Sequence, residues 1–178
     1  TRRSEPRTSL ARVLDALLSV VIAPECAACG LLLDEPTAGP VCPACWAAVH
    51  RLPAAAGTSD AAVGPYEGRL RDIIHAFKYD GRRTLAPPLA ALMREAGGSV
   101  LDGADAVVPV PLHWWHRRQR GFNQAALLAS GLGLPVYVGQ LGLPGTDEAF
   151  LAMGRELEGK TCASPFGTAA AEWQIAGR

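Results

Sequence analysis

The chain has 178 residues, 49% of them apolar, and its 17 acidic and 17 basic residues leave a formal net charge of zero. This length suits one ordinary domain plus a small appendage. The neutral total gives no indication of a polyanionic partner, which only local clusters of charge could provide. The longest apolar run, residues 14–23, is interrupted by Asp15 and Ser19 and is shorter than the ~20 residues of a membrane span. Pro24 and Glu25 make a poor signal-peptide cleavage site, so we expect a cytoplasmic protein without a membrane span.

The first element is an amphipathic helix expected over Ser9–Ile22. Apolar residues recur there at the spacing of one helical face, namely at Leu10, Val13, Leu14, Leu17, Leu18 and Val21. Ser9 can cap this helix and Pro24 ends it. We expect its apolar stripe to pack on the cysteine-rich segment that follows.

Four of the five cysteines form two knuckles, Cys26-x2-Cys29 and Cys42-x2-Cys45. Paired knuckles at this separation favour tetrahedral thiolate coordination of zinc. The alternative is a disulfide staple of a small secreted domain, which the absence of a secretory signal disfavours. Four thiolates fill the coordination sphere of zinc, so we predict a structural role for the metal. The fifth cysteine, Cys162, is interpreted as a small apolar filler.

Short elements and a linker surround the knuckles. Leu31–Leu33 is typical of a short strand with a turn after it, and Trp46–Leu52 of a short helix. Residues 53–60 are rich in Ala, Gly, Pro and Ser, which is typical of a linker. We therefore expect a small zinc-ribbon-like module over residues 1–60.

Two helices and a buried strand are expected next. The first helix covers Glu67–Tyr79, with Gly81 as its stop, and the second covers Leu89–Ala96 between a proline pair and a glycine pair. Residues 104–110 are β-branched and almost uncharged, which is typical of a buried strand in a parallel sheet.

The pattern continues to residue 138 and then fades. A helix is expected over Gln124–Ser130, capped by Asn123, followed by a strand over Leu134–Val138. We expect residues 61–138 to form the second domain. Residues 139–178 show weak periodicity and no clear strand, which predicts an atypical, poorly ordered tail.

The chemical candidate is the segment His113–Gly121, expected to be a loop after the buried strand. Arg117, Arg118 and Arg120 supply charged planar groups that match phosphate oxygens. Gly121 and Asn123 follow at an expected helix N-terminus, where backbone N–H groups favour an anion. The alternative, a solvated basic turn, is equally compatible with the residue types alone.

Two further features have competing interpretations. Lys78 is a second candidate for phosphate binding, although a cation at a helix C-terminus is also favoured by the helix dipole. Trp114 and Trp115 could stack on a base, but the commoner role of such side chains is to cover the edge of a core.

Taken together, these residues resemble the ComF family, phosphoribosyltransferase-like proteins associated with DNA uptake in competent bacteria. The ordered motifs that carry the resemblance are Pro24-x-Cys26-x2-Cys29, Cys42-Pro43-x-Cys45, Tyr66-x-Gly68-x-Leu70-Arg71, Phe77-Lys78-Tyr79-x-Gly81, Pro109-Val110-Pro111-Leu112 and Arg120-Gly121-Phe122-Asn123-Gln124-Ala125. The resemblance covers about residues 9–136.

The resemblance implies an α/β fold of the type I phosphoribosyltransferase kind, a parallel sheet flanked by helices, preceded by the zinc module. It implies that the loop His113–Arg120 binds pyrophosphate and that the ligand is phosphoribosyl pyrophosphate. An intact family member would also use Mg²⁺.

The chain departs from the family in its C-terminal part. Family members carry two adjacent aspartates followed by Thr-Thr-Gly, and neither sequence occurs in this chain. We therefore expect an incomplete fold and an impaired enzyme. Shifting the frame by one nucleotide over Arg155–Ala163 is compatible with Arg-Ala-Arg-Arg-Glu-Asn-Val-Arg, which resembles a family segment, so we hypothesise a frameshift after about Val136.

An alternative function belongs to a different class. A zinc-containing accessory protein could bind single-stranded DNA through Trp114, Trp115 and the arginines, by stacking and charge, without enzyme activity. Its partners would be single-stranded DNA or the DNA-uptake machinery.

Overall fold

The computed structural model describes residues 9–21, 23–53, 61–110, 112–138, 140–141 and 155–163. The chain divides into two compact units: residues 1–50 with 66–85, and residues 51–65 with 86–178. Residues 66–85 therefore group with the cysteine segment, whereas the linker composition placed the boundary near residue 60. Most of the expected tail, including residues 142–154 and 164–178, lies outside the described residues.

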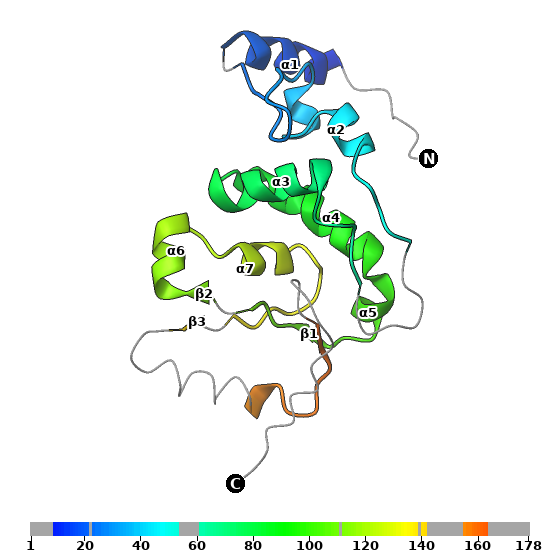
Figure 1. Ribbon diagram of the computed structural model, residues 1–178, viewed down its shortest axis with the longest axis vertical. Coiled ribbons are helices and arrows are strands. Elements are labelled where there is room, and N and C mark those ends of the chain that lie inside the picture. The colour runs from blue at the N-terminus through cyan, green and yellow to red at the C-terminus, as the bar shows by residue number, and fades with distance from the viewer. Residues whose placement is uncertain are drawn as a thin grey trace. The chain divides into compact units, whose positions relative to one another are not determined.

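The first unit is built from short elements around the cysteines (Figure 1). In chain order they are α1 (Ser9–Val21), the 3-10 helix η1 (Pro36–Ala38), α2 (Pro43–Ala47), α3 (Gly68–Tyr79) and the 3-10 helix η2 (Arg83–Leu85). The strand expected at Leu31–Leu33 is reduced to one antiparallel bridge between Leu32 and Glu25. The helix expected over Trp46–Leu52 lies earlier, because Pro43 favours the first turn of a helix and starts α2 there.

Helix α1 has the expected bounds but not the expected contacts. Its stripe faces solvent: Leu10 is 78% exposed, and Val13, Leu14 and Leu17 are exposed as well. Among the side chains of α1 that the structure describes, the buried one is Asp15, which accepts hydrogen bonds from the backbone N–H of Thr37 at 2.9 Å and from its hydroxyl at 2.6 Å. The expectation that the stripe packs on the cysteine segment is therefore wrong, because a charge-assisted bond to η1 fixes the opposite side of α1.

Helix α3 confirms the helix expected from residue 67. It buries Leu70, Ile73, Ala76 and Phe77, the three- and four-residue spacing of one helical face. The chain leaves the helix at Gly81, whose positive φ of 66° is a conformation that glycine adopts without steric cost.

The second unit begins with α4 (Ala86–Ala96), which starts earlier than predicted because its proline pair falls in the first turn. The short α5 (Gly98–Asp102), which the sequence analysis did not anticipate, follows it. Helix α7 (Gln124–Ala129) lies beside α4 (Figure 1). A Cβ atom at Gly131 would lie 2.6 Å from the Cβ of Ala90, so glycine is required for this close approach.

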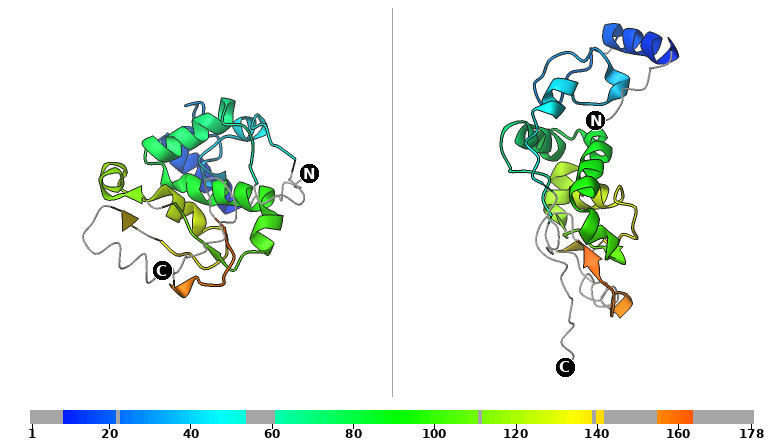
Figure 2. Two further views of the ribbon diagram at one scale, coloured as in Figure 1. Left: turned by 60° about the horizontal axis from the view of Figure 1, so that its bottom comes forward. Right: turned by 90° about the vertical axis from the view of Figure 1, so that its right-hand side faces the viewer.

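Short parallel pairings lie beside these helices. Strand β1 (Ala106–Val107) pairs with β4 (Cys162–Ala163), and β2 (Leu112–His113) pairs with β3 (Gln140–Leu141), both in parallel. Strand β4, orange in Figure 2, lies beside β1. The strand expected at residues 134–138 is reduced to a parallel bridge between Val136 and Val107.

These pairings bear on two expectations from the sequence. The expectation that no clear strand follows Gly139 is wrong, because β3 and β4 lie after it. Strand β4 pairs with β1, and Leu157 packs on Ala106. The parallel direction is the one expected. Because each ladder joins only two residue pairs, the phosphoribosyltransferase-like sheet stays a prediction.

Among the described residues, no helix combines the length and the apolar character that crossing a membrane would require.

Replacing Asp15 with Ala is expected to lower the free energy of unfolding by about 1–3 kcal/mol, because the two donors of Thr37 lose a buried acceptor. The measurement is urea denaturation of the full chain followed by circular dichroism. Asp34→Ala is the matched control, since Asp34 is an exposed carboxylate in the same unit. Equal stability of the two variants would show that the Asp15 contact does not fix α1.

Candidate functional site

The four knuckle cysteines converge on one point of the first unit. Cys26 and Cys29 lie in the segment that the antiparallel bridge between Glu25 and Leu32 closes. Cys42 is the residue before α2, and Cys45 lies within α2. Their sulfur atoms all lie within 4.8 Å of one another. The sulfurs of Cys29 and Cys42 are 3.9 Å apart, close to the edge of about 3.8 Å that four Zn–S bonds of ~2.3 Å give in a tetrahedron.

No disulfide joins these four cysteines in the structure. A disulfide requires an S–S separation of about 2.0 Å, and all four thiols are free. The four cysteines therefore form a group that could bind a metal ion such as zinc. This confirms that the two knuckles come together, which the spacing predicted.

Backbone hydrogen bonds shape the first knuckle. The N–H of Cys26 donates to the carbonyl of Leu31 at 2.8 Å, and the N–H of Gly30 donates to the carbonyl of Cys26 at 2.9 Å. Gly30 has a φ of 72°, the left-handed conformation that closes the turn after Cys29. The knuckle is thus held by its own backbone as well as by its sulfurs.

The sulfur of Cys26 accepts backbone N–H groups. Cys42 donates to it at 3.3 Å and Ala28 at 3.5 Å. Burial raises the pKa of Cys26, but the N–H donors of Cys42, Ala28 and Cys29 outweigh it and lower this pKa from 9.0 to about 6. Cys26 is therefore prepared to be a thiolate, the form in which cysteine binds metal.

Cys45 is shifted in the opposite direction. Burial raises the pKa of Cys45 well above its ordinary value, and the hydrogen bonds and charge of the neighbouring cysteine side chains raise it further. Several thiolates at these distances repel one another unless a cation lies between them. The electrostatics of the group therefore favour a bound divalent ion over four free thiolates.

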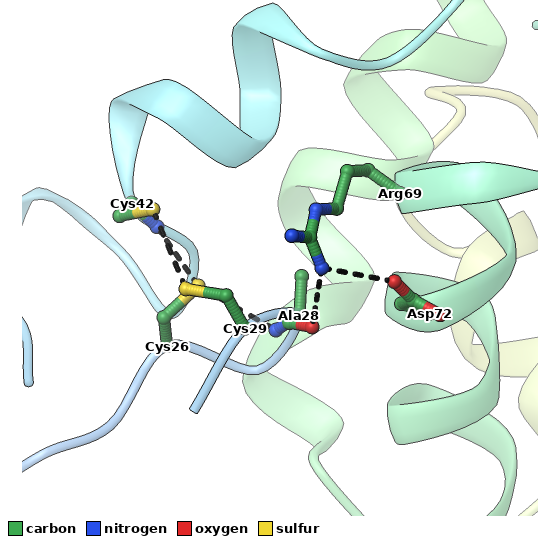
Figure 3. A network of polar contacts seen from close by, with 6 residues as sticks. All are labelled: Cys26, Ala28, Cys29, Cys42, Arg69 and Asp72. Carbon is green, nitrogen blue, oxygen red and sulfur yellow. Dashed lines mark hydrogen bonds and ion pairs between the residues drawn. The ribbon is translucent and has the colours of Figure 1, made fainter. Parts of the chain in front are cut away.

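An arginine of α3 lies at the first knuckle (Figure 3). The Nη1 of Arg69 donates to the carbonyl of Ala28 and to Oδ2 of Asp72, both at 3.2 Å. Negative charge at Cys45 and the bond to Asp72 raise the pKa of Arg69, so the guanidinium stays charged. No sequence pattern indicated Arg69, because its contact with Ala28 joins residues 41 positions apart, beyond the range of helical or CxxC spacing.

A second arginine contacts the same knuckle. The Nη1 of Arg82, just beyond the end of α3, donates to the carbonyl of Glu25 at 2.9 Å. Its contact crosses 57 positions of the chain, so no local pattern could have indicated it.

The arginine segment after β2 is a helix, α6 (Trp114–Arg120), and the expectation of a loop over His113–Gly121 is wrong. Residues 114–120 contain no glycine or proline, and arginine and glutamine are good helix formers. The side chains of Arg117 and Arg118 are exposed, and Trp115 is 51% exposed.

Three other predicted phosphate contacts lie at the end of α6 and in the turn that leads to α7. Gly121 has a φ of 73°, which makes the turn between the helices. Asn123 caps α7 as expected: its Oδ1 accepts the N–H of Ala126 at 3.2 Å. The Nη1 of Arg120 donates to Oε1 of Gln124 at 3.4 Å, so this arginine bonds within the chain.

Lys78, the remaining predicted phosphate contact, lies in the last turn of α3 and is half-buried. It belongs to the first unit, whereas Arg117, Arg118, Arg120 and Asn123 belong to the second. The structure therefore brings the four cysteines together and places the three arginines on one helix, α6. Lys78 lies in the other unit.

Comparison with protein-family models, curated proteins and solved structures gives no match to this chain. The resemblance to the ComF family therefore rests on the sequence motifs alone.

Replacing Cys42 with Ser is expected to lower the zinc bound per chain and to destabilise the first unit, because one of the four thiolates is lost. Zinc is measured by atomic absorption after dialysis, and stability by thermal denaturation. Cys162→Ser is the control, since Cys162 is not one of the four clustered cysteines. Unchanged metal content in Cys42→Ser would contradict zinc binding by this group.

Proposed function

We propose that this chain is a ComF-like phosphoribosyltransferase homologue that binds phosphoribosyl pyrophosphate or another phosphate ligand through Arg117 and Arg118. The observation that supports the proposal best is the exposure of these adjacent arginines on α6, directly after strand β2. Guanidinium groups are permanently charged and their paired donors match phosphate oxygens. A ligand position after a parallel strand is also the usual one in α/β folds.

The residues after α6 have a supporting role in this proposal. Gly121 and Asn123 set the turn into α7, and Arg120 is held by Gln124. These contacts keep the last turn of α6 in a defined position. In this proposal, the exposed Arg117 and Arg118 contact the ligand.

The metal in this proposal is zinc with a structural role. Cys26, Cys29, Cys42 and Cys45 offer four sulfur ligands within 4.8 Å of one another, and four thiolates around zinc leave no position for a reacting water. Among the described residues up to 50, the buried apolar side chains other than cysteines are Leu33, Val41 and Val49, and zinc binding would stabilise a segment with so small a core.

We propose further that enzyme activity is impaired. The acidic pair and the Thr-Thr-Gly sequence that would bind the ribose phosphate and support Mg²⁺ are absent from the sequence. The chain would therefore bind the pyrophosphate part of the ligand and lack the other half of the site. Its resemblance links it to DNA uptake in competent bacteria.

One observation favours the second candidate, a single-stranded DNA-binding protein without enzyme activity. Trp115 is 51% exposed and precedes the exposed Arg117 and Arg118 on the same helix. An exposed aromatic ring beside cations can stack on a base while the cations contact the backbone.

Replacing Arg117 and Arg118 together with Ala is expected to weaken binding of phosphoribosyl pyrophosphate at least ~10-fold, since each charge-assisted bond is worth about 1.5–3 kcal/mol. The dissociation constant is measured by calorimetry at fixed salt. Arg155→Ala is the control, since Arg155 is exposed elsewhere in the same unit. Equal affinity of the double variant and the wild type would remove α6 from the site.

The same titrations distinguish the two candidate functions. Trp115→Ala should leave phosphoribosyl pyrophosphate binding nearly unchanged, because no base is stacked. If the chain instead binds an oligonucleotide in a salt-dependent way, and Trp115→Ala weakens that binding, the second candidate is favoured.

A further inference from the structure

Helix α3 contacts the first knuckle at two separate points. Arg69, in the first turn of α3, donates to the carbonyl of Ala28, which lies between Cys26 and Cys29. Arg82, just past the last turn, donates to the carbonyl of Glu25, the residue before Cys26. The two guanidinium groups therefore bind the knuckle backbone on both sides of Cys26.

From this geometry we infer that Arg69 and Arg82 act as positioning residues for the metal site, clamping the Cys26–Cys29 knuckle onto α3 so that metal binding and α3 stabilise each other. The inference rests on zinc being the ion bound by the four cysteines. It assigns to α3 a role that no cysteine motif indicates. We call Arg69 and Arg82 the arginine clamp.

The bonding of Arg69 favours a fixed position. Asp72, one turn further along α3, accepts from the same Nη1 at 3.2 Å, so the guanidinium is held between the helix and the knuckle (Figure 3). Side chains of the ion pair are 41% and 40% exposed, so the pair itself contributes little to stability. Its contribution here is to orient a donor toward a carbonyl of the knuckle.

Charge gives the clamp a second effect. Zn²⁺ with four thiolates carries two net negative charges, and hydrogen-bond donors and cations outside the ligand shell stabilise such a centre. The bond from Arg69 to the carbonyl of Ala28 holds its positive charge beside the first knuckle. Groups outside the ligand shell typically change metal affinity by ~10–100-fold.

The division of the chain into two compact units agrees with the arginine clamp. Residues 66–85, which contain α3 and both arginines, form one compact unit with residues 1–50. Binding free energy at a site formed only in the folded chain is also folding free energy. Zinc should therefore stabilise the knuckles and α3 together.

The test compares zinc affinity and hydrogen exchange in the full chain. Arg69→Ala/Arg82→Ala is expected to weaken zinc binding by ~10–100-fold in competition with a chromogenic chelator. Arg71→Ala is the matched control, because Arg71 is an exposed arginine of the same helix and the same charge. Its zinc affinity should stay within about twofold of the wild type, as is usual for exposed positions.

Hydrogen exchange separates coupling from a general loss of stability. In the wild type, removing zinc should increase amide exchange in the knuckles and also in residues 70–79. When the double variant is reloaded with excess zinc, the amides of the knuckles should regain protection from exchange. The amides of residues 70–79 should regain much less protection. If the double variant does not fold, Arg69→Lys and the single variant Arg69→Ala serve instead. Lysine keeps the charge but replaces the planar guanidinium with an ammonium group on a shorter side chain, so the zinc affinity of Arg69→Lys should lie between those of Arg71→Ala and Arg69→Ala.

Two results would overturn the inference. One is wild-type zinc affinity in the arginine variants, and the other is protection of residues 70–79 that does not respond to zinc in the wild type. Neither result affects zinc binding by the cysteines, which Cys42→Ser tests separately, or phosphate binding by α6.

Discussion

Electrostatic repulsion among four cysteine sulfurs is the constraint on which the first unit depends. The structure brings these atoms within 4.8 Å of one another, lowers the pKa of Cys26 to about 6 and raises that of Cys45. Such a group cannot hold four thiolates without a cation at its centre. Binding a divalent ion removes the repulsion and joins two knuckles that are separate in the sequence.

Polar contacts join elements around the knuckles, in addition to the apolar face that α3 buries. Asp15 attaches α1 to η1 through Thr37, and the two arginines of the clamp attach α3 to the first knuckle. Each of these bonds involves a charged group, and such bonds are stronger than neutral ones. This explains how the leucines of α1 can be exposed while the helix keeps a defined contact.

The arginine segment 114–120 was predicted only in part from the local sequence pattern. The sequence predicted three arginines after a buried strand and a helix capped by Asn123, and the cap is present. It did not predict that residues 114–120 form a helix, on which Arg117 and Arg118 are exposed while Arg120 bonds to Gln124. Helix propensity decided this, since the segment contains no residue that would interrupt a helix.

The sequence by itself determined the features that local spacing controls: the bounds of α1, α3 and α7, the Asn123 cap, and the meeting of the two knuckles. Regular spacing was sufficient because helical periodicity and CxxC turns act over a few residues. Only the tertiary structure decided which face of α1 is buried, that β4 pairs with β1, and that Arg69 and Arg82 contact the first knuckle. These contacts join positions far apart in the chain, and their choice depends on which polar groups find partners when the chain closes on itself.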